Sequence, residues 1–301
     1  MSKFDDVIGG YVILNDAHRM PRIGLGTSRI VDQESLDVSV RAALKAGYRL
    51  FDTAHIYKNE AELGAALEKY LPEFGLKRED IFITTKVPTR DADPAGEAKK
   101  LIQESLNKLR TDYLDLVLVH YPRDRDTGKD DNHEVNSRGR RAVWEVLEEF
   151  KTRNVIRSIG VSNFMNYHLS EIEKYAKIPP AVNQIEYQPY LTQDLVRLQC
   201  KHQEIFVQAF SSLCWGNQEI LNETAVQSAA KKHCVSPQTI LYAFALNTGV
   251  GIVPKSATPS RIHGNLHDVA KIKLSEEDVG DLLALDRNTA FCPGCDPWKT
   301  L

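Results

Sequence analysis

The chain is poor in several features that would assign it to a specialised class of protein. It has 301 residues but only five cysteines, and an odd, sparse set at this length predicts reduced cytosolic thiols instead of a disulfide framework. No apolar run approaches the roughly 20 residues needed to cross a bilayer, so no membrane partner is expected. The first ten residues carry Lys3, Asp5 and Asp6 where a secretory signal would be apolar, which predicts a cytoplasmic protein.

An excess of charge of either sign is also missing. The 38 basic and 41 acidic side chains give a net charge of −3, whereas a nucleic-acid binder needs a basic patch, so nucleic acid is not an expected partner. The apolar fraction of 42% and the charged fraction of 26% are ordinary for a globular enzyme and exclude a disordered or collagen-like chain. No linker or internal repeat divides the sequence, so residues 1–301 are expected to form one domain.

The usual dinucleotide fingerprint is incomplete as well. Gly24-Leu25-Gly26 lacks the third glycine and a matching acidic residue in a βαβ setting, so a Rossmann domain is poorly supported.

What the sequence does contain is an alternation of short apolar runs with longer amphipathic segments. The runs are mostly unbroken, as is typical of strands buried on both faces of a parallel sheet. The expected strands are 22–27, 50–53, 81–86, 113–120, 155–162, 181–186, 205–211 and 249–255, and the expected helices are 34–46, 60–70, 94–109, 142–151, 167–176, 193–203 and 240–246. This order predicts an α/β protein with a (β/α)8 TIM barrel.

Local signals mark the ends of several of these elements. Asp93-Pro94, Ser236-Pro237 and Thr258-Pro259 each pair a capping residue with proline at the first helical position, and Gly47 is placed to end a helix. Residues 11–21 resemble an N-terminal β-hairpin, and the acidic segment after Ser275 predicts an extra C-terminal helix, followed by a tail.

Polar residues interrupt the apolar pattern where the expected strands end. In a barrel these ends face the active site. Taken singly, Lys86 could be a solvated strand end and His120 a core histidine. Their coincidence with the other strand ends favours one shared site, made from Asp52, Lys86, His120, Ser162, Asn163, Gln184, Ser211 and Lys255.

Longer motifs occur in the same places. The clearest is the stretch from Gly47 to Glu60, which reads GYRLFDTAHIYKNE. The others are Met20-Pro21 with Gly24-Leu25-Gly26-Thr27, Thr84-Thr85-Lys86, Val119-His120-Tyr121-Pro122, Gly160-Val161-Ser162-Asn163-Phe164, Asn183-Gln184-Ile185-Glu186-Tyr187 and Ile252-Val253-Pro254-Lys255-Ser256. In this order, from about residue 12 to the C-terminus, the motifs resemble those of the aldo-keto reductases.

The resemblance implies NADPH-dependent reduction of aldehydes or ketones by a tetrad of Asp52, Tyr57, Lys86 and His120. Tyr57 would give a proton to the carbonyl oxygen, which His120 would orient. Because a phenol with a pKa near 10 is a weak acid at neutral pH, we expect Lys86, held by Asp52, to lower that pKa by about two to three units.

The resemblance also implies an NADPH/NADP+ site on the barrel. Ser162, Asn163 and Gln184 match positions that bind the nicotinamide carboxamide, and Phe210 matches the ring-stacking position. Ser211 and Leu213 match pyrophosphate contacts, and Lys255 and Arg261 would bind the 2′-phosphate. Thr27, Ser256, Thr258 and the adenine contact Asn265 complete the expected set, although Gly264 stands where the family usually has glutamate.

The expected substrate pocket departs from the family pattern. Ser28 and Pro88 stand where many relatives have large aromatic residues, while Ile56, Tyr121 and Trp298 would supply apolar walls. The charged segment 123–141, which includes Arg138, Arg140 and Arg141, is expected to be a solvated loop. The sharper alternative is a wide, polar-rimmed mouth for small aldehydes and dicarbonyls.

Two other functions remain open at this point: an NADPH-binding regulatory or structural barrel with little turnover, and a Schiff-base aldolase that uses Lys86. The expected partner is a small carbonyl substrate, and the expected assembly is a monomer or weak dimer. No metal is expected. Cys292 and Cys295 have redox-motif spacing but no second ligand pair, which favours a flexible surface thiol pair, and His263 and His267 favour a solvated helix face.

Overall fold

We describe the protein from a computed structural model, in which residues 4–90, 92–126, 131–292 and 294–301 are described. Eight parallel strands form one sheet in which each strand lies beside the next along the chain. Parallel bridges from Ile23 to Ile252 and from Gly26 to Lys255 join its two edges, which confirms the predicted barrel. The strands are β3 (Leu25–Gly26), β4 (Leu50–Asp52), β5 (Phe82–Val87), β6 (Leu114–Val119), β7 (Ile156–Ser162), β8 (Val182–Glu186), β9 (Phe206–Phe210) and β10 (Gly251–Ile252).

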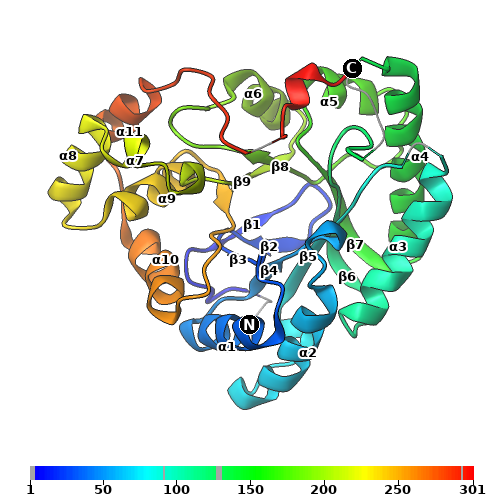
Figure 1. Ribbon diagram of the computed structural model, residues 1–301, viewed down its shortest axis with the longest axis horizontal. Helices are drawn as coiled ribbons and strands as arrows, with labels where there is room; N and C mark the ends of the chain where they lie inside the picture. Colours follow the sequence, from blue (N-terminus) through cyan, green and yellow to red (C-terminus); the bar gives the residue numbers. More distant parts are fainter. Residues whose placement is uncertain (1–3, 91, 127–130, 293) are drawn as a thin grey trace.

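Helices surround the strands as a ring (Figure 1). Most of their predicted boundary signals are used: the Asp93 and Ser236 side chains accept hydrogen bonds from the N–H groups of Gly96 and Thr239, and Gly47 ends its helix at a φ of 102°. Thr258, also predicted as a cap, makes no side-chain capping bond. The helices are α1 (Gln33–Ala46), α2 (Glu60–Tyr70), α3 (Pro94–Lys108), α4 (His133–Thr152), α5 (Asn166–Ile172), α6 (Asp194–His202), α7 (Gln218–Leu221), α8 (Thr224–His233), α9 (Pro237–Asn247), α10 (Pro259–Lys271) and α11 (Glu276–Leu283). Within the described ranges, none is both long and apolar enough to cross a membrane.

The first and last strands are shorter than the sequence predicted. β3 and β10 each keep two residues of the expected ranges 22–27 and 249–255. Pro254 has no N–H to donate to a sheet ladder, which limits regular pairing there. The backbones approach closely at this seam, because a Cβ on Gly26 would lie 2.6 Å from the carbonyl oxygen of Val253.

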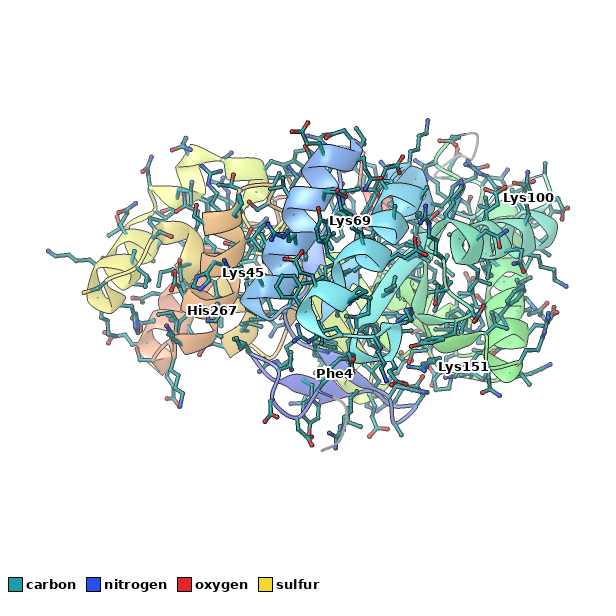
Figure 2. All side chains as sticks on the ribbon, turned by 90° about the horizontal axis from the view of Figure 1, so that it is seen from below. Phe4, Lys45, Lys69, Lys100, Lys151 and His267 are labelled. Carbon is teal, nitrogen blue, oxygen red and sulfur yellow. The ribbon has the colours of Figure 1, made fainter. Side chains whose placement is uncertain are left out.

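The predicted N-terminal hairpin, β1 (Tyr11–Ile13) paired with β2 (Arg19–Pro21), is present. Its buried side chains join a cluster at one end of the barrel, in which Phe4 and Met20 meet Leu50 and Phe82. Figure 2 shows Phe4 and Lys151 at that end, and Lys151 forms a 2.7 Å ion pair with Asp16 of the hairpin turn. The hairpin therefore covers the end of the barrel opposite the predicted site.

The charged segment 123–141 is not a solvated loop throughout, so that prediction was wrong in part. Residues 127–130 lie outside the described chain, and α4 already begins at His133. Arg140 is 1% exposed and donates to the carbonyl oxygens of Pro122, at 3.0 Å, and Leu301, at 3.2 Å, while it pairs with Glu171. Arg140 thus fastens the C-terminal segment to α4 and α5.

Two helices, α7 and α8, were missed by the sequence analysis. They stand between β9 and α9, where no helix was expected. The extra C-terminal helix α11 is present, and its predicted cap Ser275 accepts from the Asp278 N–H while Asp278 accepts from the Ser275 N–H.

Candidate active site

Three of the four predicted catalytic residues meet at Lys86, which is 0% exposed near the end of β5. Its ammonium lies 2.7 Å from Asp52 Oδ1, 2.9 Å from the Thr53 carbonyl oxygen and 3.3 Å from Tyr57 Oη. Because the strands are parallel, the ends of β4 and β5 reach the same edge of the barrel. The arrangement places a paired, desolvated ammonium directly beside a phenol.

A buried amide holds the turn that presents Tyr57. Tyr57 ends a single 3-10 turn, and Asn59, two residues later, is 0% exposed. Asn59 donates to the carbonyl oxygens of Thr27 and Ile30, at 2.9 and 2.8 Å, and accepts from the Thr53 hydroxyl at 2.7 Å. Asn59 was not among the predicted site residues, although its position as a polar residue directly before a helix is a sequence signal for such a supporting role.

His120 lies on the other side of the phenol. The Tyr57 and His120 rings are 5.8 Å apart and nearly perpendicular, at 80°. Burial lowers the pKa of His120 well below its ordinary value, and the charges of Lys86 and Arg125 act in the same direction. The imidazole is therefore neutral at physiological pH and can hydrogen-bond a carbonyl oxygen without adding a charge.

The acid–base balance differs from the sequence expectation. Burial raises the pKa of Tyr57, and this effect outweighs the opposing attraction of Lys86. Lys86 therefore acts in the expected direction, but its effect is smaller than that of burial, so the phenol pKa is not lowered overall. For Lys86, burial acts to lower the pKa, but the attraction of Asp52 and Tyr57 is stronger and raises it, so the lysine stays charged and the phenol stays protonated near neutral pH.

A cluster of amides lies next to this group. Gln184 donates to Asp52 Oδ2 at 2.8 Å and to Gln208 Oε1 at 2.7 Å, and Asn163 donates to the His120 carbonyl oxygen at 3.0 Å and to Ser162 Oγ at 3.1 Å. Both N–H bonds of each amide are thus used, while in the described chain neither Asn163 Oδ1 nor Gln184 Oε1 accepts a hydrogen bond. Two free acceptor oxygens beside the phenol fit the NH2 group of a carboxamide.

A cleft of about 790 Å³ runs from this group to the surface. Its wall includes most of the residues predicted to hold the cofactor: Ser162, Asn163, Gln184, Phe210, Ser211, Leu213, Lys255 and Arg261. Thr27, also predicted to hold the cofactor, is buried and does not line the described cleft wall. Its hydroxyl donates to the Asp52 carbonyl oxygen at 2.9 Å, so it supports the backbone that carries Asp52.

The far end of the cleft meets the start of α10. Thr258 makes no side-chain capping bond, so the first-turn N–H groups of this helix are left for an anion or water. Lys255 and Arg261 flank that end and line the cleft, whereas Ser256 is buried and Asn265 half-buried on the same segment. A Cβ at Gly264 would lie 3.0 Å from Asp268 Oδ2, a surface contact that leaves this glycine without a packing reason. The Nε2–H group of His267 donates to the Ala46 carbonyl oxygen at 2.8 Å, so His267 is not part of a purely solvated face.

The predicted substrate residues separate into two groups. Ser28 and Ile56 line the cleft. Tyr121 is 2% exposed beneath the guanidinium groups of Arg123 and Arg125, and Trp298 lies 39% exposed on the C-terminal turn. Pro88, Tyr121 and Trp298 do not contribute to the part of the cleft wall that described residues form.

An aromatic wall comes from a loop that the sequence analysis missed. Trp215, in the turn after β9, lines the cleft with Arg29, whose guanidinium carbon lies 3.8 Å from the centre of the indole ring. Both residues adopt left-handed backbone conformations, at φ values of 62° and 66°. The contact joins the segment after β3 to the turn after β9, and no sequence spacing predicts it.

The C-terminal thiols also reach the cleft, so the interpretation of a flexible surface pair was wrong. Cys292 and Cys295 line it, and Cys295 is only 6% exposed. The loop is fixed by Glu186, whose carboxylate accepts from the N–H groups of Phe291 and Cys292 at 2.7 and 2.9 Å. The part of the chain with described coordinates holds no group of three or more metal-ligating side chains.

Known proteins resemble this chain over most of its length. The sequence profile of the Aldo/keto reductase family matches residues 22–287. A glyoxal reductase of Bacillus subtilis (strain 168) is 38% identical over 287 residues, covering 95% of this chain and 96% of its own. A methylglyoxal reductase of Escherichia coli O157:H7 is 32% identical and covers 94% and 96% of the two chains.

Among solved structures, an aldo-keto reductase from a Medee basin deep-sea metagenome library superposes with a TM-score of 0.81 at 31% identity. The match covers 95% of this chain and 98% of that one. With a matching profile over most of its length, relatives above 30% identity and the same fold, this chain belongs to the aldo/keto reductase family of oxidoreductases.

Proposed function

We propose that the protein reduces aldehydes and ketones to alcohols with NADPH as the hydride donor. The observation that carries this proposal is the buried contact of Lys86 with both Asp52 and Tyr57 at the inner end of a cleft. A protonated phenol held beside a permanent positive charge is suited to give a proton to a carbonyl oxygen and then to exist briefly as a phenolate.

Each of the four side chains has a distinct part in that reaction. Tyr57 Oη is the proton donor, and Lys86 stabilises the negative charge that the donation leaves. Asp52 keeps Lys86 charged and in place, and neutral His120 orients the carbonyl oxygen by a hydrogen bond. The nicotinamide, when bound, supplies the hydride.

The cleft offers groups for each part of the cofactor. The acceptor oxygens of Asn163 and Gln184 would take the carboxamide, and the Phe210 ring would support the nicotinamide by stacking. Lys255, Arg261 and the uncapped start of α10 would take the 2′-phosphate, which favours NADPH over NADH. Ser211 and Leu213 would lie along the pyrophosphate.

For substrate we propose small aldehydes and dicarbonyls. The relatives named glyoxal reductase and methylglyoxal reductase support this class. The cleft supports it too, because Ser28 leaves space near the phenol and the arginines Arg29 and Arg125 make its rim polar.

A spectrophotometric screen tests the proposal. NADPH oxidation should proceed fastest with glyoxal and methylglyoxal and slowly with ketosteroids or polycyclic ketones. Absence of turnover with every carbonyl tested, together with tight NADPH binding, would favour the regulatory or structural barrel. Trapping of a substrate on Lys86 by borohydride would favour the aldolase instead.

We further propose a monomeric or weakly dimeric enzyme of one domain that acts in the cytoplasm. All five cysteines are free, which supports a reducing compartment.

A further inference from the structure

Gln208 is a buried amide behind the cleft that has no part in the proposed reaction. It lies on β9, is 0% exposed and is not part of the cleft wall that the described residues form. Its side-chain oxygen Oε1 accepts a hydrogen bond from Gln184 Nε2 at 2.7 Å. Because Gln184 does line the cleft, Gln208 can act on a bound molecule through Gln184.

The sheet places these two glutamines beside each other. Gln184 of β8 and Gln208 of β9 are paired directly in the parallel ladder, and paired residues on neighbouring strands send their side chains to the same face of the sheet. Asp52, at the end of β4, reaches the same place, because its Oδ2 atom accepts from Gln184 Nε2 at 2.8 Å. Strands β4, β8 and β9 thus supply one buried, hydrogen-bonded group.

Two acceptors determine which way the Gln184 amide points. Its Nε2 atom lies between Asp52 Oδ2 and Gln208 Oε1 and donates one hydrogen to each. An amide turned by 180° would bring its own oxygen against these two oxygens, and a carboxylate and an amide oxygen have no hydrogen to donate. Gln184 therefore keeps its oxygen as the unused acceptor, in a residue that lines the cleft.

Asp52 alone would not fix this orientation. The NH2 group of an amide has two hydrogens in one plane, and the terminal torsion of a glutamine side chain has broad minima. With Asp52 as the only acceptor, the amide of Gln184 could rotate and turn its second N–H toward the cleft. Gln208 Oε1 holds that second N–H inward, so Gln208 decides whether Gln184 offers the cleft an acceptor alone or a donor as well.

The fold itself is not stabilised by every polar atom of Gln208. Its Nε2 group is buried and has no hydrogen-bond partner in the described chain, and burying an N–H group without an acceptor is destabilising. Gln188 provides the contrast, because it is also 0% exposed but donates to the Thr289 carbonyl oxygen at 3.1 Å and accepts from the Tyr190 N–H at 2.6 Å. The contact with Gln184 is therefore what a glutamine at position 208 supplies.

We propose that Gln208 is a positioning residue for the nicotinamide end of the dinucleotide. By holding Gln184 with its oxygen as the free acceptor, it makes the cleft select a carboxamide NH2 over a group of the same shape that lacks these hydrogens. This role rests on the proposed binding of a nicotinamide dinucleotide in the cleft.

An acetyl group is a suitable probe of this selection. It replaces the NH2 of the carboxamide by a methyl group, so it has nothing to donate to the acceptor oxygens of Gln184 and Asn163. Covering these oxygens without giving them a partner weakens binding. If Gln208 no longer held the second N–H of Gln184, that N–H could turn toward the acetyl oxygen, and the two dinucleotides would bind more equally.

The experiment compares the Kd of NADP+ with the Kd of its 3-acetylpyridine analogue, both measured on the full chain by isothermal titration calorimetry. NADP+ should bind the wild type at least about 10-fold more tightly than the analogue. Gln208→Met keeps the size of the side chain but removes the acceptor, so this ratio should fall by about 3- to 10-fold. Gln208→Glu keeps an acceptor oxygen and should retain most of the wild-type ratio.

Gln188→Met is the matched control, because it makes the same substitution at an equally buried glutamine outside the described cleft wall. It removes two hydrogen bonds, so its Tm should fall, while the ratio of the two Kd values should equal that of the wild type. A purely structural role of Gln208 would give the same pattern in Gln208→Met, with both dinucleotides weakened by one factor.

The outcomes separate this proposal from the proposed function. An unchanged ratio in Gln208→Met, or a fall in Gln208→Glu as large as in Gln208→Met, would overturn the role of Gln208 and leave the reductase function standing. Failure of the wild type to bind either dinucleotide at millimolar concentration would refute the cofactor site itself, and the role of Gln208 with it.

Discussion

The two ends of the cleft use positive charge in opposite ways. At the inner end, Lys86 is 0% exposed and its ammonium is engaged by Asp52 at 2.7 Å. At the outer end, Lys255 and Arg261 are exposed and form no salt bridge with any residue of the described chain. A buried, paired cation tunes its neighbours, whereas an exposed, unpaired one is available to a ligand.

The difference has consequences for substitution. Removing one partner of a buried ion pair leaves an uncompensated charge, which costs about 3–5 kcal/mol. The exposed end has no such penalty, and its contributions are graded and weakened by salt. We therefore expect changes at the inner end to abolish chemistry and changes at the outer end to alter preference.

The largest effect is expected for Tyr57→Phe at the inner end. The phenylalanine keeps the ring but removes the proton donor, so kcat for methylglyoxal should fall by at least about 10²-fold. The Kd for NADPH should change little, because in the described chain Tyr57 hydrogen-bonds to Lys86 and to none of the proposed cofactor groups. Stopped-flow reduction and fluorescence titration measure the two quantities.

A matched control for that change is Tyr175→Phe, since the Tyr175 hydroxyl is buried, lies outside the cleft and has no hydrogen-bond partner in the described chain. It should reduce substrate at the wild-type rate. Full activity in Tyr57→Phe would refute the assignment of the proton donor.

The next effect is expected for Lys255→Glu at the outer end. A charge-assisted contact to a phosphate is worth roughly 1.5–3 kcal/mol, so the ratio of kcat/KM for NADPH over NADH should fall by about 10- to 100-fold. The change should appear mainly in KM for NADPH.

Lys271→Glu, at the opposite end of α10, makes the same change of net charge away from the cleft and should leave the ratio as it is. Equal use of NADH and NADPH by the wild-type enzyme would show that Lys255 and Arg261 do not bind the 2′-phosphate.

A smaller effect is expected from a substitution in the cleft wall that faces the substrate. Ser28→Trp adds an aromatic surface to the cleft wall, and at about 25 cal/mol per Å² a partly buried ring should lower KM for aromatic aldehydes by about 10-fold. KM for methylglyoxal should rise or stay the same, because the space near the phenol shrinks. Ketosteroids that bind the wild type best, at low micromolar KM, would contradict this view of the pocket.

The smallest effect is expected from pH. The pKa of Tyr57 is raised above its ordinary value of 10.0, so the donor form persists as pH rises, and the pKa of His120 is lowered well below 6.5, so the neutral form persists as pH falls. The reduction rate should therefore change by less than about twofold between about pH 6 and about pH 9. A steep loss of kcat near neutral pH would show that one of these groups titrates there.

The residues at the inner end of the cleft could be predicted from sequence alone, because in a barrel the position of a residue at the end of a strand also gives its location in the fold. Asp52, Lys86 and His120 each lie at the end of a parallel strand, and parallel strands end at one edge. The direction of the Tyr57 pKa could not be predicted, because it depends on how completely the surrounding side chains exclude water.

Contacts between distant segments were also beyond the sequence. Arg138-Gly139-Arg140-Arg141 has the composition of a solvated surface, but the Leu301 carbonyl oxygen docks on Arg140 from 161 residues away. Arg29 and Trp215 likewise meet at the cleft although they are distant in the sequence, and the C-terminal loop brings Cys292 and Cys295 to it. No local periodicity or spacing carries this information.

The seam between β3 and β10, where the barrel closes, lies beside the cleft. The barrel closes there by bridges such as Ile23 to Ile252, between segments that lie at opposite ends of the chain. Ser28 follows one side of the seam and Lys255 the other, so a dinucleotide lying in the cleft would hold both sides together. Opening of the seam would then compete with binding of the dinucleotide, so by mass action the enzyme with bound dinucleotide would open less often. Under the proposed function, a shortage of the dinucleotide would therefore leave this seam more accessible to proteases.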